Sequence, residues 1–290
     1  PALLGRSLEQ FHLWFGLWMS LFCVMTVWIA LSLRSAALGS EEFRPGARLA
    51  FWWVLAIGPL SVNRFDFWPA LITLIAVERA YSRRWGWSGF AIGLGFATKV
   101  YPVILLPVLA VVAWNIYPLK QRIRPLASLF AAAALGVVVM VAPVALMAGP
   151  DLLRDLSSHL QRPLEIEAVL GTPLLFAPDS FVYRSFGSSN LGGPHVEALS
   201  MLSLPLTVVA FSCSCVLAYR LSKRNPDQAI IDGSLWALLA SLCCAKVFSP
   251  QYLLWLFPLA LASPGYYRRA VVLALIACSL VAQVWYPTLW

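Results

Sequence analysis

The hydrophobic and polar positions divide the chain into long apolar runs separated by short polar connections. Each run is predicted to be a helix that enters a membrane, because soluble helices and strands alternate apolar with polar positions. The ten runs cover residues 11–33, 49–62, 67–81, 88–99, 101–117, 126–148, 196–219, 229–247, 251–263 and 270–288.

Composition strengthens this prediction. Of the 290 residues, 60% are hydrophobic and 12% are charged, and the mean hydropathy is +0.77, values that ordinary soluble domains do not approach. We therefore predict an all-α polytopic membrane protein, with residues 1–290 forming one integral membrane domain of about ten helices, several of them short. The net charge of +8 indicates orientation in such a chain, and no nucleic-acid partner is expected.

The six cysteines all lie in apolar stretches, and none stands at metal-ligand spacing with one of the three histidines. They are expected to pack in the core or to face lipid. No Asp-x-Asp pair lies in the connections predicted to face outward, so neither a metal ion nor a cofactor is predicted.

The basic residues predict the orientation. If every run crosses the membrane, alternate connections lie on the same side, and one side then collects fourteen of the 21 Lys and Arg residues. This bias predicts that the basic side is cytoplasmic. The outer side then holds Arg6, Arg64, Lys99, Arg154, Arg162, Arg184 and Lys246.

Several runs are too short to cross the bilayer in the usual way. Residues 88–99 would form about 18 Å of helix, against a hydrocarbon core of ~30 Å. Pro102 and Pro250 are expected to end helices at the level of Lys99 and Lys246, because proline lacks a backbone donor and restricts its predecessor. Non-helical backbone at this depth is tolerated only beside protein or a water-filled cavity. We expect an outward-facing cavity whose floor carries both lysines.

The long polar connection, residues 149–195, is predicted to lie on the outer side. Residues 151–160 are expected to form an amphipathic helix at the interface. Pro163 is expected to open a second short helix that ends by Gly171 and Pro173, and residues 187–194 are expected to form a flexible loop.

The two lysines occur in matching strings, Lys99-Val-Tyr-Pro and Lys246-Val-Phe-Ser-Pro. A lysine at membrane depth is costly and marks a path, a pocket or an anionic partner. Cations with few acids at the same depth suit a phosphate, and a phosphate carried on a lipid would arrive at this level. The outer-side polar residues that one cavity could collect are Asn63, Arg64, Asp66, Lys99, Arg154, Asp155, His159, Arg162, Glu165, Glu167, Lys246 and Gln251.

Most of these residues also have a purely structural explanation. Lys99 could extend to the headgroups from a helix end. Asp66 could pair with Arg64 or cap the helix that begins near residue 67. The acids at 165 and 167 fit the positive end of a short helix. Tyr101 could stack on a sugar ring or mark a membrane interface.

Two longer motifs carry a family resemblance: Gly93-Leu-Gly-Phe-Ala-Thr-Lys-Val-Tyr-Pro-Val-Ile-Leu-Leu-Pro107 and Ser249-Pro-Gln-Tyr-Leu-Leu-Trp-Leu-Phe-Pro258. Together with Asp66 at the start of its helix and the outer stretch from His159 to Glu167, they resemble glycosyltransferase family 87. The members of this family are integral membrane enzymes of the C-type glycosyltransferase (GT-C) superfamily.

The resemblance implies transfer of a hexose, typically mannose, from a polyprenyl-phosphate sugar to a lipid-linked or glycan acceptor. The reaction would take place on the outer face of a bacterial plasma membrane, with inversion, while cations hold the departing phosphate. On this interpretation the substrate-binding residues are Lys99, Lys246, Arg64, His159, Arg162, Gln251 and Tyr101.

The resemblance also implies a catalytic carboxylate in a first outer loop. Family members begin with a further helix and then this loop, and the sequence resembles the part that follows it. The catalytic base is therefore expected before Pro1, and Asp66 and Glu167 are the weaker candidates within the sequence.

Two other function classes fit parts of the pattern. A transporter or flippase of a lipid-linked or anionic solute would also have broken helices and charges at membrane depth. No inverted repeat is visible, however, and the titratable groups gather toward one face. A purely structural membrane subunit would leave the paired lysines without a reason.

Overall fold

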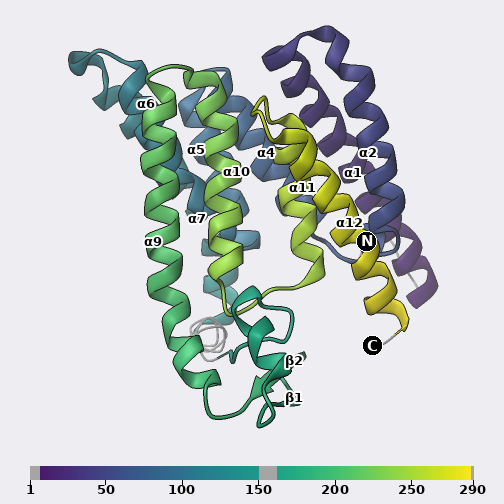
Figure 1. Ribbon diagram of the computed structural model, residues 1–290. Helices are drawn as coiled ribbons and strands as arrows, with labels where there is room; N and C mark the ends of the chain where they lie inside the picture. The colour runs from purple at the N-terminus through teal and green to yellow at the C-terminus, as the bar shows by residue number, and fades with distance from the viewer. Residues whose placement is uncertain (1–6, 150–161, 289–290) are drawn as a thin grey trace.

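The computed structural model describes residues 7–149 and 162–288, and these residues form a bundle of helices with one small hairpin (Figure 1). The all-α architecture predicted for a polytopic membrane protein is confirmed. Each of the ten apolar runs overlaps one of the main helices: α1 (Leu8–Leu38), α2 (Phe43–Ile57), α4 (Phe67–Tyr81), α5 (Trp85–Thr98), α6 (Leu105–Ile116), α7 (Ile123–Ala148), α9 (Val196–Ser222), α10 (Pro226–Cys244), α11 (Leu253–Ala262) and α12 (Arg268–Thr288). The short helix α3 (Leu60–Asn63) follows α2.

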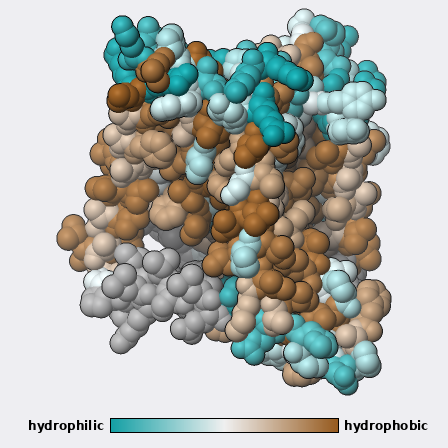
Figure 2. All heavy atoms as spheres, turned by 60° about the vertical axis from the view of Figure 1, so that its left-hand side comes forward, coloured by the Kyte–Doolittle hydropathy of each residue, from teal (hydrophilic) through white to brown (hydrophobic). Residues whose placement is uncertain are grey.

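The surface has the layering of a membrane protein. Figure 2 shows a broad hydrophobic belt between two hydrophilic ends. Three described helical stretches are long and apolar enough to cross a membrane: Leu8–Leu38, Leu119–Ala148 and Val196–Ser222. Their exposed leucine, valine and phenylalanine side chains are costly in water but favourable against lipid.

Alternate connections meet at the same end of the bundle, as the sequence predicts. We call one end the basic end; it holds the connections α1–α2, α4–α5, α6–α7, α9–α10 and α11–α12. The buried Arg34 joins two of these connections, because its guanidinium donates to the Leu261 carbonyl over 3.0 Å and to the Glu42 carboxylate over 2.6 Å. An ion pair between Arg83 and Asp227 joins two others.

The opposite end, which we call the loop end, holds the α5–α6, α7–α9 and α10–α11 connections. Figure 1 shows the hairpin at this end, beneath α9 and α10. Two short helices have one of their ends at the loop end: α5, which has 14 residues, and α11, which has ten. At ~1.5 Å per residue they span about 21 Å and 15 Å, less than a hydrocarbon core of ~30 Å. The prediction that several of the apolar helices are short is therefore confirmed.

Glycine sets the contact between α5 and α7. A β-carbon on Gly89 would overlap the carbonyl oxygen of Leu129, and one on Gly93 would overlap that of Ala133. On the facing helix, a β-carbon on Gly136 would lie 2.5 Å from the Phe90 carbonyl oxygen. Missing side chains let two backbones approach closely, which is how membrane helices gain packing energy without a hydrophobic driving force between them.

The outer connection departs from the prediction. Leu164 to Ile166 have extended pairing where a helix was expected: the Leu164 carbonyl accepts from the Leu191 amide over 2.9 Å, and the Ile166 amide donates to the Ser189 carbonyl over 3.1 Å. A 3-10 helix, Val169–Phe176, follows and contains Pro173. Burial of Leu164 against Leu191 outweighs the local helix-start signal of Pro163.

The predicted flexible loop is also wrong. Residues 187–194 contribute to an antiparallel hairpin of β1 (Phe181–Ser185) and β2 (Ser188–Gly192), in which Val182 pairs with Leu191. Asn190 is fully buried, and its amide donates to the Ser185 carbonyl over 3.0 Å. The helix predicted at 151–160 lies outside the described residues, as do Arg154, Asp155 and His159.

Candidate functional site

The first cluster at the loop end is built around an ion pair between Lys99 and Asp66. Helix α5 ends at Thr98, and Lys99 has extended backbone with φ −153° and ψ 139°, so its side chain leaves the helix axis. Asp66 directly precedes α4 and is fully buried. The Lys99 Nζ lies 2.5 Å from the Asp66 Oδ1.

Aromatic rings surround this ion pair. The Lys99 ammonium lies 4.8 Å from the ring centroids of Phe65 and Trp255, and 5.5 Å from that of Tyr252. The Trp255 indole N–H also donates to the Asp66 Oδ1 over 2.8 Å. A cation held by one carboxylate and faced by rings has few alternative positions.

Tyr101 also belongs to this cluster, because it contacts Trp255. The two rings stack at 4.0 Å with an interplanar angle of 10°, and Tyr252 stacks on Trp255 at 4.0 Å. The Tyr101 hydroxyl forms a 2.9 Å hydrogen bond with the Thr73 hydroxyl. Tyr101 is only 7% exposed, so its ring packs against Trp255 and leaves little surface for contact with a sugar.

The structure decides between the structural alternatives for Asp66. Its side chain forms no capping bond to α4, and its ion pair is with Lys99, 33 residues away, in place of the predicted Arg64. Arg64 is exposed next to this cluster, close enough for its charge to act on Lys99. Asp66, Lys99 and Arg64 are thus brought together.

The second cluster surrounds the carboxylate of Glu165, which is 2% exposed. It accepts from the Arg162 guanidinium over 2.5 Å, and the Ser188 hydroxyl and the Phe248 backbone amide lie close enough to favour its charged form. Burial raises the pKa of Glu165 even though these donors act in the opposite direction. The prediction that Glu165 belongs to the first turn of a helix is wrong, because its backbone pairs with Asn190 of β2 and its amide donates to the Lys246 carbonyl.

Lys246 lies in that α10–α11 connection, just after α10 ends at Cys244. Its backbone carbonyl accepts from the Glu165 amide over 2.9 Å, and its side chain is half-buried. The two clusters are neighbours, because the Phe248 ring meets the Tyr252 ring at 5.8 Å and Tyr252 faces Lys99. Both lysines of the matching strings therefore lie at the loop end.

Three candidate residues carry a buried polar atom that has no hydrogen-bond partner among the described residues. These atoms are the Asp66 Oδ2, the Arg162 Nε and the Gln251 Oε1. Buried polar groups in folded proteins are almost always paired, so each of these atoms has the capacity for a further hydrogen bond. Gln251 belongs to the 3-10 helix Pro250–Tyr252, next to the ring that faces Lys99.

Glu167 is the second acid of the outer connection. Burial and the neighbouring charge of Glu165 raise its pKa to about 7. A carboxyl group with this pKa exchanges protons near neutral pH, which is the property required of a general base or acid. No group of three His, Cys, Asp or Glu side chains in the described ranges could hold a metal ion.

Sequence reasoning missed Trp255 and Phe65 as parts of the site. Trp255 follows Tyr252 by three residues, a spacing that places both on one helix face, and this was the available signal. The expected cavity above both lysines does not coincide with either of two prominent grooves among the described residues. Those grooves flank α5, and neither is lined by Lys99 or Lys246.

The sequence profile of glycosyltransferase family 87 matches residues 2–245. This match includes Asp66, Lys99, Arg162 and Glu165 and ends one residue before Lys246. No curated protein and no solved structure matches the chain significantly. The profile covers 244 of the 290 residues, and the chain is therefore a membrane glycosyltransferase of family 87.

Proposed function

We propose that this protein transfers a hexose, mannose in the first instance, from a polyprenyl-phosphate sugar to a lipid-linked or glycan acceptor. The loop end would face outward from a bacterial plasma membrane, and the two clusters would bind the sugar phosphate. The observation that carries the proposal is the Lys99–Asp66 ion pair, which holds an ammonium at the loop end of a short helix.

The reaction places a clear electrostatic demand on such a site. The bond between the anomeric carbon and the bridging phosphate oxygen breaks, and its electron pair leaves with the phosphate. The oxygen of an acceptor hydroxyl forms the new bond from the opposite face, and its proton passes to a carboxylate. Because the phosphate gains negative charge as the bond breaks, fixed cations beside it stabilise the transition state.

Lys99 fits the role of such a cation. Its ammonium has three N–H donors, and Asp66 accepts one of them. The remaining donors are available to a phosphate oxygen, since about a fifth of the side-chain surface is exposed. Asp66 fixes the position of the ammonium, and the exposed Arg64 adds the positive charge that Asp66 cancels.

The second cluster is proposed to bind the sugar and the remaining phosphate oxygens. Lys246 and Gln251 flank the segment that Glu165 holds in place, and the Arg162 Nε has no hydrogen-bond partner among the residues that the structure describes. Residue 159 is proposed as a further contact on sequence grounds alone. Glu167 is the described acid whose pKa, about 7, best suits proton transfer at neutral pH.

The test is transfer of mannose from polyprenyl-phosphate mannose by membranes that contain the protein. The informative variant is the double substitution Asp66→Asn with Lys99→Met, which removes both charges of the buried pair while keeping similar volumes. We expect normal insertion and at least a hundredfold loss of transfer, the order of a missing electrostatic contact in an enzyme.

The matched control is Lys223→Met. Lys223 also faces an aromatic ring, that of Tyr219 at 4.4 Å, but it lies at the basic end. Its loss should leave transfer unchanged. Wild-type transfer by the inserted double variant would contradict the role of the ion pair. Movement of a lipid-linked solute across vesicles without sugar transfer would favour a flippase.

A further inference from the structure

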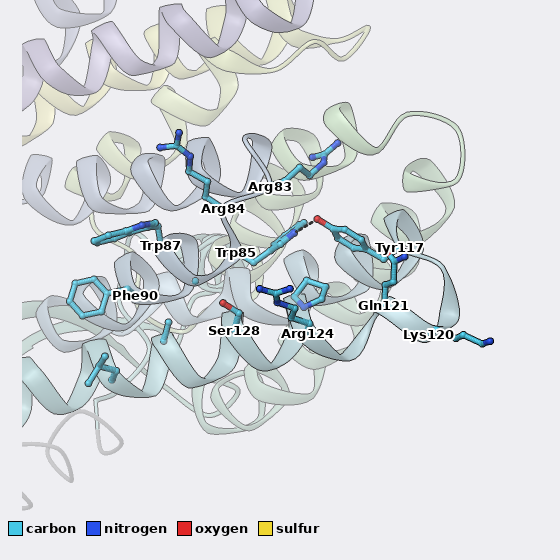
Figure 3. A pocket seen from close by; sticks show the side chains of 14 residues that line it. Arg83, Arg84, Trp85, Trp87, Phe90, Tyr117, Lys120, Gln121, Arg124 and Ser128 are labelled. Carbon is cyan, nitrogen blue, oxygen red and sulfur yellow. Dashed lines mark hydrogen bonds between the residues drawn. The ribbon is translucent and has the colours of Figure 1, made fainter.

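A groove at the basic end lies outside the proposed catalytic region. It has a volume of about 1250 Å³ and runs between the start of α5, the end of α6 and the first half of α7 (Figure 3). We propose that this groove binds one anionic phospholipid, with the headgroup phosphate at Arg124 and one acyl chain along α7.

The charges at the mouth of the groove are the first argument. Arg83, Arg84, Lys120 and Arg124 are among the described residues that line it, and none of the lining residues is acidic. Asp227 neutralises Arg83. The other three cations are exposed and form no ion pair with any residue that the structure describes; Arg84 and Arg124 lie at the groove, whereas the Lys120 side chain extends away from it (Figure 3). An uncompensated group of cations at a membrane surface attracts anionic lipid headgroups.

The polarity of α7 is the second argument. Arg124, Ser128, Ala132 and Leu135 follow one another at helical spacing and all line the groove, so one face of α7 changes from cation to hydroxyl to hydrocarbon. Arg124 and Leu135 are about 16 Å apart along the axis, close to the ~15 Å of one hydrocarbon leaflet. A phospholipid has the same order of groups over the same length.

The walls of the groove are built and fixed. Figure 3 shows Arg124 and Ser128 on α7 facing the Trp85–Phe90 stretch of α5, while Lys120 extends away from the groove. The buried Trp85 donates its indole N–H to the Tyr117 hydroxyl over 3.0 Å, which ties α5 to the end of α6. A β-carbon on Gly86 would lie 2.8 Å from the Ser128 hydroxyl oxygen, so the floor is where α5 and α7 meet.

The aromatic residues complete the match to a lipid. Trp87 is 66% exposed beside the groove, and Phe90 lies one helical turn deeper. Tryptophan prefers the interface between headgroups and hydrocarbon, and phenylalanine prefers the hydrocarbon. A soluble anion would use the cations but would not account for the apolar continuation toward Leu135.

The experiment compares retained lipids. The protein is reconstituted in bilayers of equal parts phosphatidylglycerol and phosphatidylcholine, extracted mildly, and weighed with its bound lipids by native mass spectrometry. We expect the wild type to retain phosphatidylglycerol in preference to phosphatidylcholine. Arg124→Gln should lower this preference about fivefold, since a basic residue at the membrane surface contributes ~1 kcal/mol of lipid attraction.

Two further variants separate the site from diffuse attraction. Arg220→Gln removes the same charge from the last turn of α9, at the same end but outside the groove, and should leave the preference unchanged. Ala132→Trp fills the apolar part and should lower retention of both lipids. Equal retention of the two lipids by the wild type, or equal losses in Arg124→Gln and Arg220→Gln, would overturn the proposal.

Discussion

Lys99 and Asp66 are 33 residues apart in the sequence, and their charged atoms, Nζ and Oδ1, lie 2.5 Å apart at the loop end of the bundle. The pair joins the end of α5 to the start of α4, and the Trp255 indole adds a third helix, α11. A buried ion pair with several hydrogen bonds is costly to disrupt on one side only. The two charges must therefore be considered as one unit.

The first prediction concerns stability as distinct from activity. Lys99→Met leaves the fully buried Asp66 without its cation, and we expect a loss of about 3–5 kcal/mol in the free energy of unfolding. Adding Asp66→Asn should recover most of this loss without recovering sugar transfer. Thermal melting of the purified single and double variants measures the effect. Equal melting temperatures for wild type and Lys99→Met would show that the pair does not stabilise the fold.

The second prediction concerns the carboxylate of Glu165. Glu165→Ala removes the acceptor of the Arg162 guanidinium, and we expect a local loss of about 1.5–3 kcal/mol. Hydrogen exchange should accelerate at the amides of Glu165 and Leu191, whose bonds cross this junction. Glu197→Ala, an exposed acid in the first turn of α9, is the control and should leave exchange unchanged.

The third prediction is a pH dependence at Glu167. Its pKa is raised from 4.5 to about 7 in the folded protein, so the fold favours the protonated form. The stabilisation is complete below pH 4.5 and is lost as the pH rises through about 7. Glu167→Gln should therefore gain on the order of 1–3 kcal/mol relative to wild type between pH 4 and pH 8. A constant difference between the two melting curves across this range would contradict the raised pKa.

The fourth prediction tests the contact between α5 and α7. Gly89→Ala places a methyl group where the Leu129 carbonyl oxygen lies, and we expect a loss of at least 2 kcal/mol as the helices separate. Gly16→Ala is the matched control, because a β-carbon on Gly16 meets nothing within 4 Å and alanine favours a helix. The melting temperature should fall for Gly89→Ala and should rise or stay unchanged for Gly16→Ala.

The sequence predicts the helices well because their signals are local. Apolar runs and prolines predict helix ends at the level of both lysines, and the structure ends α5 at Thr98, one residue before Lys99, and α10 at Cys244, two residues before Lys246. Each of these inferences depends on residues within one or two turns of one another.

The clusters could not be predicted in the same way because their contacts join distant segments. Asp66 has Arg64 two residues away, and only the packing of α4, α5 and α11 determines that Lys99 and Trp255 reach it instead. The extended segment at Glu165 likewise depends on β2 and on the carbonyl of Lys246. These long-range pairings outweigh the local helix signals near Pro163.

Every residue of α11, from Leu253 to Ala262, is buried. A helix that is surrounded by other helices does not contact lipid. Changes in acyl-chain length or membrane tension therefore act first on the peripheral helices. Trp255 belongs to this buried helix, and its indole N–H holds the Asp66 carboxylate in position. The position of the Lys99–Asp66 ion pair is thus set by contacts inside the bundle. Bilayers of different thickness should therefore leave its geometry unchanged.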